Sequence, residues 1–301
     1  MRPEQRHQAI LEMLIERGRV EVDELVNALG ASAMTVRRDL AMLESAGSLR
    51  RVYRGAEPQR SGSYEPPFAL RSRLNVEAKR RMAGTVRDLV RSGETVILDG
   101  GSTGVAIAEA IADLAVTVCT PSMRVANALL ASPSVRLMLT GGIVRSNEQT
   151  LVGASALQTL GGFRFDTFLM TASAAHARHG VTEWNPDDAE VKRAALASAE
   201  RCVLTVDTSK FGQTAFARVA GWDDIDELVT DAELPDDLAL AIDSAGVRLR
   251  VAAAPAATGA RTDGSPAGHA SLAPPSAATV KPGAPAPSVR SRGRRPRPPR
   301  A

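Results

Sequence analysis

Three short runs at the start of the chain place apolar residues at the three- and four-residue spacing of amphipathic helices. We expect helices over about residues 5–16, 22–29 and 33–46. The first two runs end at Gly18 and Gly30, and glycine readily takes the left-handed conformation that follows a helix. Three short helices with a three-residue turn before the third predict a helix-turn-helix.

The third run has the features of a DNA-recognition helix. Ser32 is a suitable N-cap, Gly47 suits the position after the helix, and Val36, Leu40 and Leu43 form a single apolar stripe. The stripe leaves other side chains on the remaining faces, namely Thr35, Arg37, Arg38 and Met42. An arginine pair alone fits an ordinary surface helix, but in the three-helix context it predicts contacts with base edges and phosphates.

Residues 49–55, just after this helix, alternate apolar and basic side chains as a short β-hairpin would. We interpret this segment as the wing of a winged helix-turn-helix, with its arginines along a DNA backbone. The residues expected to contact double-stranded DNA are therefore Ser32, Thr35, Arg37, Arg38, Arg50, Arg51, Tyr53 and Arg54.

Beyond residue 77, short and fully apolar runs alternate with helical runs. Strands are expected over residues 95–98, 116–119, 135–139, 167–170, 202–206, 228–229 and 247–251. Helices are expected over residues 83–91, 105–112, 123–130, 189–199 and 236–244. This repeated order predicts an α/β domain whose mostly parallel sheet is covered on both faces.

Turns rich in glycine and hydroxyl groups follow four of the expected strands. Open α/β sheets bind ligands beyond the carboxyl ends of their strands, and free N–H groups at a helix start favour anions. Tight turns also use glycine and serine, so each turn alone is weak evidence, whereas four turns at one sheet edge predict a ligand site. The expected effector-binding residues are Asp99, Gly100, Gly101, Ser102, Thr103, Thr120, Ser122, Gly141, Gly142, Arg145, Asp207 and Lys210.

Charge is distributed unevenly along the chain. The net charge is +3, but residues 251–301 carry eight basic side chains against one aspartate, so the first 250 residues are acidic overall. Residues 253–301 are rich in Pro, Ala and Arg and contain no aromatic residue, which predicts a disordered tail. Its arginines either add sequence-independent attraction to DNA or have no role. Because no apolar run is long enough for a signal segment or a membrane span, we expect a soluble, cytoplasmic protein.

The opening of the chain resembles the winged helix-turn-helix of the DeoR family of bacterial transcriptional regulators. The family signature matches Val22, Glu24, Leu25, Leu29, Gly30, Ser32, Thr35, Arg37, Arg38, Asp39, Leu40, Leu43, Glu44, Gly47, Leu49 and Arg51. At the wing tip, where the family usually has His-Gly-Gly-Ala, this chain has Tyr53-Arg54-Gly55-Ala56.

The rest of the chain, to about residue 252, is similar to the family's sensor domain, a fold related to ribose-5-phosphate isomerase and CoA-transferase subunits. This resemblance includes the strand-end turns and begins with Pro67, Phe68, Arg71, Asn75 and Lys79. It implies a repressor of a sugar or carbohydrate catabolic operon that a phosphorylated sugar or related metabolite releases. Because a single small head buries too little surface for high specificity, we also expect a homodimer or homotetramer. The expected parts are a DNA-binding domain (1–56), a linker (57–76), a sensing and oligomerisation domain (77–252) and the tail (253–301).

The strand-end residues allow a second interpretation. Asp99, Asp207 and Lys210 have the chemistry of the acid and base groups of a sugar-phosphate isomerase. A sensor needs the same groups only to hold hydroxyls and phosphate, and the fused DNA-binding head favours a ligand that is bound without being converted. We therefore expect no catalytic residue and no enzyme activity.

Other candidate chemistry has less support. His176 and His179 would share a metal ion only on a helix, so loop or effector-side histidines are favoured and no metal or cofactor is expected. The charged run 187–193 is interpreted as a solvated helix start. Cys119 and Cys202 lie in apolar, strand-like runs, which favours buried structural thiols.

Overall fold

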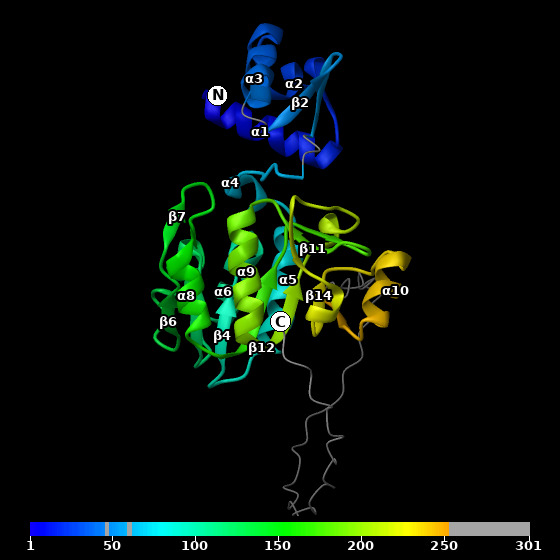
Figure 1. Cartoon of the computed structure of the whole chain (residues 1–301). Helices are drawn as coiled ribbons and strands as arrows, with labels where there is room; N and C mark the ends of the chain where they lie inside the picture. Colours follow the sequence, from blue (N-terminus) through cyan, green and yellow to red (C-terminus); the bar gives the residue numbers. More distant parts are fainter. Residues whose placement is uncertain (46–47, 59–61, 253–301) are drawn as a thin grey trace, which may run out of the picture. The chain divides into compact units, whose positions relative to one another are not determined.

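The computed structural model describes residues 1–45, 48–58 and 62–252 (Figure 1). Gly47 and the expected tail at 253–301 lie outside the described residues. The predicted fold class is confirmed, since a winged helix-turn-helix is followed by a large parallel sheet with helices. Within the described ranges, no helix has the length and apolar character needed to cross a membrane.

The first 58 residues form the head. Its helices are α1 (Pro3–Arg17), α2 (Val22–Leu29) and α3 (Ala33–Ser45), and its strands are β1 (Val20–Glu21), β2 (Leu49–Val52) and β3 (Gly55–Pro58). The strands pair antiparallel in the order β1-β3-β2, so the expected hairpin gains a third strand from the segment before α2. Gly18 and Gly30 follow α1 and α2 with φ of 71° and 60°, as predicted.

The core of the head joins the three helices to the wing. The predicted stripe of α3 (Val36, Leu40 and Leu43) is buried. Asp39 of α3 is buried too, and Arg6 of α1 donates to both of its carboxylate oxygens, at 2.8 and 3.1 Å. Burial raises the pKa of Asp39, but hydrogen bonds from α1 lower it by more, so the ionised carboxylate holds α1 against α3.

The body is built on a seven-stranded parallel sheet in the order β15-β14-β12-β9-β4-β5-β6. Its strands are β4 (Thr95–Leu98), β5 (Thr117–Thr120), β6 (Arg136–Leu139), β9 (Phe165–Thr171), β12 (Ala199–Thr205), β14 (Glu227–Thr230) and β15 (Arg248–Val251). Each lies within about three residues of a strand predicted from the sequence.

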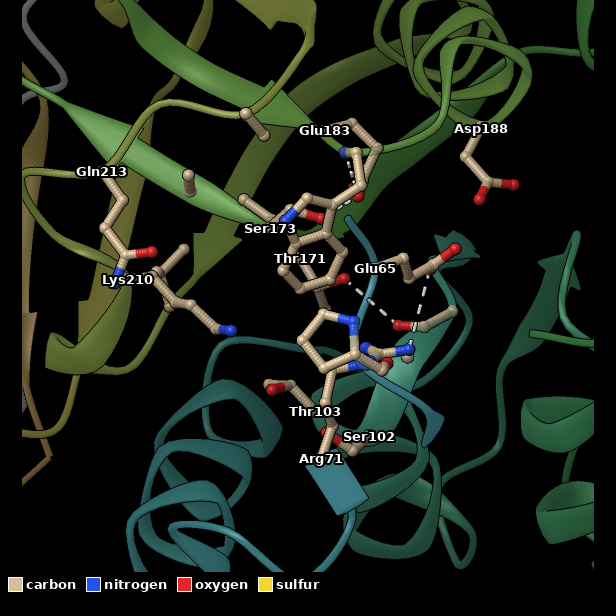
Figure 2. A pocket seen from close by; sticks show the side chains of 18 of the residues that line it. Glu65, Arg71, Ser102, Thr103, Thr171, Ser173, Glu183, Asp188, Lys210 and Gln213 are labelled. Carbon is tan, nitrogen blue, oxygen red and sulfur yellow. Dashed lines mark hydrogen bonds and ion pairs between the residues drawn. The ribbon is translucent and has the colours of Figure 1, made fainter. Parts of the chain in front are cut away.

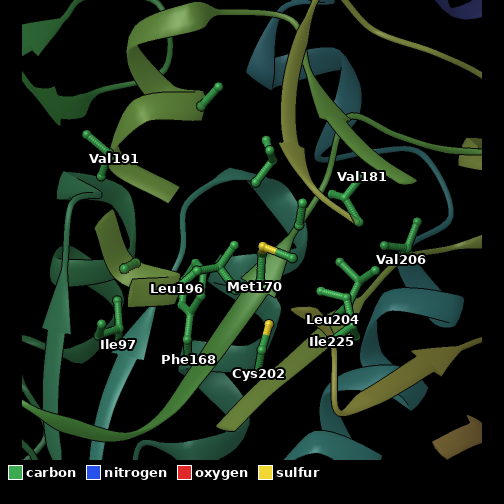
Figure 3. Close-up of a cluster of buried hydrophobic side chains, with 14 of the residues drawn as sticks. Ile97, Phe168, Met170, Val181, Val191, Leu196, Cys202, Leu204, Val206 and Ile225 are labelled. Carbon is green, nitrogen blue, oxygen red and sulfur yellow. The ribbon is translucent and has the colours of Figure 1, made fainter. Parts of the chain in front are cut away.

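Helices cover both faces of this sheet. One face carries α5 (Val76–Arg87), α6 (Gly101–Ile111) and α7 (Met123–Leu129), and the other carries α8 (Ala154–Gly161), α9 (Pro186–Ser198) and α10 (Asp236–Ser244). Neighbouring residues of β4 point to opposite faces of the sheet, since Val96 and Leu98 pack in the first layer and Ile97 packs in the second. Figure 3 shows Ile97 within the second layer. Burial of both faces explains why the strands are continuously apolar. Cys119 and Cys202 are buried and form no disulfide, as predicted.

Several elements were not predicted. They include a hairpin of β7 (Ile143–Arg145) and β8 (Thr150–Val152), an antiparallel sheet of β10 (Ala174–His176), β11 (Gly180–Glu183) and β13 (Ala217–Ala220), helix α8, and the short helices α4 (Phe68–Arg71), η1 (Thr208–Lys210) and η2 (Trp222–Asp224). The expected linker at 57–76 therefore contains the end of β3 and all of α4. Leu70 of α4 is fully buried in the hydrophobic cluster of the head.

Candidate functional site

Helix α3 exposes the arginine pair that was predicted to read DNA. Arg37 and Arg38 are exposed, and their guanidinium groups make no hydrogen bond or ion pair with any other residue that the structure describes. Ser32 Oγ accepts a hydrogen bond from the backbone N–H of Thr35 at 3.2 Å, which fixes the start of the helix. Met34, which the sequence analysis did not single out, is 82% exposed one turn before the arginines. The first half of α3 thus offers two unpaired guanidinium groups to a DNA groove.

The wing arginines, in contrast, are already paired with carboxylates of the head. The pairs are Arg50–Glu57 at 2.8 Å, Arg51–Glu44 at 2.6 Å and Arg54–Asp23 at 3.0 Å. Exposed pairs of this kind are weak, so a DNA phosphate can replace the carboxylate. Arg54 has φ of 61°, which explains why the related family usually has glycine at the wing tip. Tyr53, beside it, is 85% exposed.

A cavity of about 960 Å³ lies at the carboxyl edge of the parallel sheet (Figure 2). Its lining includes the turns after β4, β9 and β12 and the segment 62–66 that precedes α4. This is the edge at which open α/β sheets bind ligands, and the volume is that of a small-molecule site.

The cavity brings together most of the predicted effector-binding residues. Those that line it are Asp99, Gly100, Gly101, Ser102, Thr103, Asp207 and Lys210. The predicted residues that do not line it are Thr120, Ser122, Gly141, Gly142 and Arg145.

Local structure explains these departures. Thr120 and Ser122 are fully buried, where Ser122 Oγ caps α7 by accepting from the N–H of Val125 at 3.3 Å. The Gly141–Gly142 turn follows the edge strand β6 and leads away into the β7–β8 hairpin. Gly142 has φ of 116°, and a Cβ there would stand 2.4 Å from the carbonyl oxygen of Val152. These two glycines are therefore needed for the hairpin, independently of any ligand.

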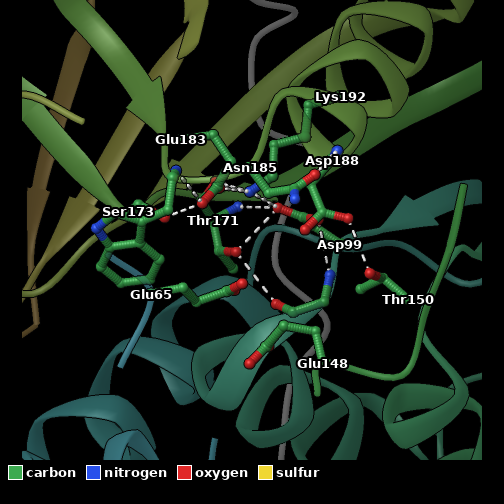
Figure 4. Close-up of polar contacts among 12 residues, drawn as sticks. Glu65, Asp99, Glu148, Thr150, Thr171, Ser173, Glu183, Asn185, Asp188 and Lys192 are labelled. Atoms are coloured by element: carbon green, nitrogen blue, oxygen red, sulfur yellow. Dashed lines mark hydrogen bonds and ion pairs between the residues drawn. The ribbon is translucent and has the colours of Figure 1, made fainter. Parts of the chain in front are cut away.

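Asp99 is held by groups of the protein (Figure 4). Its carboxylate accepts from the N–H of Gly100 at 2.7 Å and from the N–H and Oγ1 of Thr171, both at 2.9 Å. Lys192 Nζ lies 2.7 Å from Asp99 and 2.6 Å from Glu183. Burial lowers the pKa of Lys192, but the two carboxylates raise it by more, so the lysine stays charged. This buried triad shapes the turn after β4.

A second polar cluster surrounds Arg145. Its guanidinium contacts Asp188 and lies 2.5 Å from Glu65, and Asp188 also accepts from Thr150 Oγ1 at 2.8 Å. Arg145 is therefore occupied by carboxylates and not free for a phosphate. The run 187–193 does begin a helix, and its residues Asp187, Glu190 and Arg193 are exposed as predicted, but the interpretation as solvated is wrong for Asp188 and Lys192, which are buried.

Cationic groups gather where the cavity meets α6. Lys210 Nζ lies 4.9 Å from the centre of the Trp184 ring, and the Arg71 guanidinium lies 5.3 Å from the same ring. The ammonium group of Lys210 makes no hydrogen bond or ion pair with another described residue, and burial lowers its pKa. Lys79 donates to the carbonyl oxygen of Leu74 at 2.6 Å and is buried, which lowers its pKa to about 8. The cavity therefore contains positive charge that carboxylates do not fully neutralise.

Family models match both parts of the chain. A DeoR-like helix-turn-helix domain matches residues 6–61, and a DeoR C-terminal sensor domain matches residues 74–232. The chain belongs to the DeoR family.

Relatives of known name agree with this assignment. The chain is 34% identical over 248 residues to a protein of Escherichia coli O157:H7 provisionally named as an aga operon transcriptional repressor, covering 81% of this chain and 92% of the relative. It is 30% identical to the glycerol-3-phosphate regulon repressor of Escherichia coli K12 over 78% of this chain and 93% of that one. Ribose 5-phosphate isomerase A of Methanocaldococcus jannaschii matches at 16% identity and a TM-score of 0.35, over 46% of this chain and 55% of the isomerase. The chain is thus a DNA-binding transcriptional regulator, and the isomerase interpretation is not favoured.

Several residues of this DeoR-family cavity were not predicted as site residues. They include Glu65, Arg71, Asn75, Lys79, Glu148, Thr171, Ser173, Glu183, Trp184, Asp188, Lys192 and Gln213. The family motif at the start of the sensor domain could have identified Arg71, Asn75 and Lys79 as site residues, because they are its polar positions. Asn75 has φ of 52° and donates to Asp207 at 3.1 Å, so it joins α5 to the turn after β12.

The histidine pair lies outside this cavity. His176 and His179 are on and after β10 in a hairpin, with ring centres 4.7 Å apart, and neither lines the cavity. Of the two alternatives that the sequence left open, this location agrees with loop histidines and not with effector-side ones. Among the described residues, no group of three or more metal-ligating side chains is found.

Proposed function

We propose that this chain represses a sugar or carbohydrate catabolic operon and that a phosphorylated sugar or related metabolite releases it from DNA. The observation that carries the effector class is the ammonium group of Lys210, which is half-buried in the cavity without a carboxylate partner among the described residues. A desolvated charge without a partner is unfavourable, so an anionic ligand is the natural partner. The printed name of a relative, a glycerol-3-phosphate regulon repressor, agrees with this class.

The start of α6 supplies the second element of the proposed phosphate site. Gly101, Ser102 and Thr103 open this eleven-residue helix and line the cavity, and their N–H groups stand at the positive end of its dipole. Arg71 is near, because its Nη1 lies 3.6 Å from where a Cβ on Gly101 would stand. We infer that the phosphoryl group binds between this helix start, Arg71 and Lys210.

Repression requires more than one head, because helix-turn-helix proteins gain specificity by binding two half-sites. We infer a homodimer or homotetramer. The heads can adopt an arrangement that matches the spacing of the half-sites and one that does not, and the effector binds the second more tightly. Operator affinity therefore falls by the factor by which the effector prefers the second arrangement. We also infer that the ligand is held without turnover, since Asp99 and Asp207 already accept several hydrogen bonds within the protein.

The test is a gel shift of the purified protein on its own upstream DNA, repeated with glycerol 3-phosphate, glucose 6-phosphate, fructose 1-phosphate and ribose 5-phosphate. Specific retardation that one compound relieves is the expected result. If none of the compounds alters the retardation, the proposed effector class is wrong. If there is no specific retardation, the proposal that the protein represses through this upstream DNA is wrong.

Lys210→Ala is expected to leave operator binding intact and to weaken binding of the active phosphate compound about 10- to 100-fold, because a charge-assisted hydrogen bond is lost. Isothermal titration of the compound measures the loss, and the gel shift measures the induction that goes with it. Arg178→Ala is the matched control, because Arg178 is an exposed cation of the body that does not line the cavity. Normal induction of the Lys210 variant would place the phosphate elsewhere.

A further inference from the structure

Glu65 places a carboxylate of the expected linker inside the cluster around the effector cavity. Its carboxylate lies 2.5 Å from Arg145 Nη2 and 3.8 Å from Arg71 Nη2. Figure 2 labels Glu65 and Arg71 among the residues that line the cavity. The flanking residues are attached to the body as well. The carbonyl oxygen of Gly62 accepts from the N–H of Phe216 at 2.8 Å, and that of Pro66 accepts from Arg71 Nε at 2.9 Å. Residues 62–66 thus form one wall of the cavity, with the Glu65 carboxylate as their charged contact.

Glu65 is one of three carboxylates that share two guanidinium groups. Arg71 and Arg145 face three carboxylates, those of Glu65, Glu148 and Asp188. Glu148 and Asp188 come from the body itself and are buried. Burial and the neighbouring Glu148 raise the pKa of Glu65 to about 7, despite both arginines. With three negative groups for two guanidinium groups, one carboxylate is in excess.

The location of Glu65 along the chain connects this cluster to the DNA-binding head. It stands seven residues after Pro58, the last residue of wing strand β3, and three residues before α4. Arg71, in turn, contacts both Glu65 and the Trp184 ring beside Lys210. A ligand anion that attracts Arg71 toward Lys210 and the start of α6 therefore removes a partner from Glu65.

We propose that Glu65 is a built-in competitor of the effector: its carboxylate shares Arg71 in the free protein, and the anionic group of the effector draws Arg71 away, which weakens the attachment of the linker to the body. This inference rests on the anionic effector of the proposed function. Through Glu65, binding of a ligand in the cavity would affect the segment that leads to the wing.

The test compares Glu65→Gln with the wild type in the full chain. Isothermal titration uses inorganic phosphate and the four phosphate compounds named above. Without its competing charge, the variant should bind the active compound about 5-fold or more tightly, the range of ordinary coupling between sites. Hydrogen exchange at residues 62–65 should rise on ligand addition in the wild type and already be raised in the ligand-free variant. Glu77→Gln is the control, since it removes the same charge from an exposed pair with Arg80 on α5.

Each outcome decides a separate claim. Equal binding by the wild type and Glu65→Gln overturns the competition while keeping the effector class. Weaker binding by the variant also overturns it, because Glu65 would then contact the ligand directly. If neither protein binds any phosphate compound, the proposed effector class fails and the competition fails with it. If Glu65→Gln does not fold, Glu65→Asp keeps the charge with a shorter reach and should show a smaller shift in the same direction.

Discussion

Replacing Arg38 by alanine is expected to weaken operator binding about 5- to 100-fold while leaving the protein folded. Arg38 is exposed on α3 and makes no contact with another described charged group, so its removal breaks nothing within the head. A side chain that contacts a base edge contributes about 1–3 kcal/mol of discrimination. The loss should therefore be much larger on the operator than on unrelated DNA.

Gel shifts on the operator and on a scrambled duplex, at one salt concentration, measure this difference. Arg17→Ala is the matched control, because Arg17 lies at the end of α1 in the same head and is half exposed. It removes the same charge away from the recognition helix. If Arg38→Ala and Arg17→Ala weakened binding equally, the effect would come from net charge and α3 would not be the reading element.

The head was predictable because its signals are local. The apolar stripe of α3 and the glycines after α1 and α2 depend on residues within one or two turns, and the structure reproduces them. Strand β1 was not predicted, because two residues are too few to show the alternation of apolar and polar positions that marks a strand. It is a strand only through its pairing with β3. The parallel sheet was predictable for a related reason, since strands buried on both faces are continuously apolar.

The cavity at the sheet edge was only partly predictable, because strand order decides which turns meet. The turns after β4 and β12 flank the central strand β9 and converge, whereas β6 is an edge strand whose turn leads away. Sequence patterns do not give that order. The turn after β9, with Thr171 and Ser173, was missed because it lacks the glycine-rich composition that marked the others.

The burial of two charged residues of α9 could have been predicted from the sequence, but these residues were interpreted as solvated. Val191, Ala195 and Leu196 form its buried stripe, and Asp188 and Lys192 fall on the same face at helical spacing. Charged residues on an apolar face indicate internal partners, because unpaired burial is costly. Which partners they find, Arg145 for one and Asp99 with Glu183 for the other, depends on the folded sheet.

Lys192→Met is expected to destabilise the body by about 3–5 kcal/mol, the usual effect of removing one partner from a buried ion pair. The change leaves the carboxylates of Asp99 and Glu183 buried and facing each other, and it removes the hydrogen bond from Lys192 Nζ to the carbonyl oxygen of Thr171 at 2.9 Å. For a domain of this size the unfolding temperature should fall by about 6–20 °C. Thermal and denaturant unfolding followed by circular dichroism measure both quantities.

Two further variants separate the buried triad from a general effect on α9. Arg193→Met removes the neighbouring charge, which is exposed and donates one hydrogen bond to the carbonyl oxygen of Arg218 at 2.6 Å, and it should cost no more than about 1.5 kcal/mol. Adding Glu183→Gln to Lys192→Met removes one of the two stranded carboxylates and should restore part of the loss, because the residues interact directly. If Lys192→Met were as stable as Arg193→Met, the lysine would not be the counter-ion that holds the turn after β4. The effector cavity would then depend on other contacts for its shape.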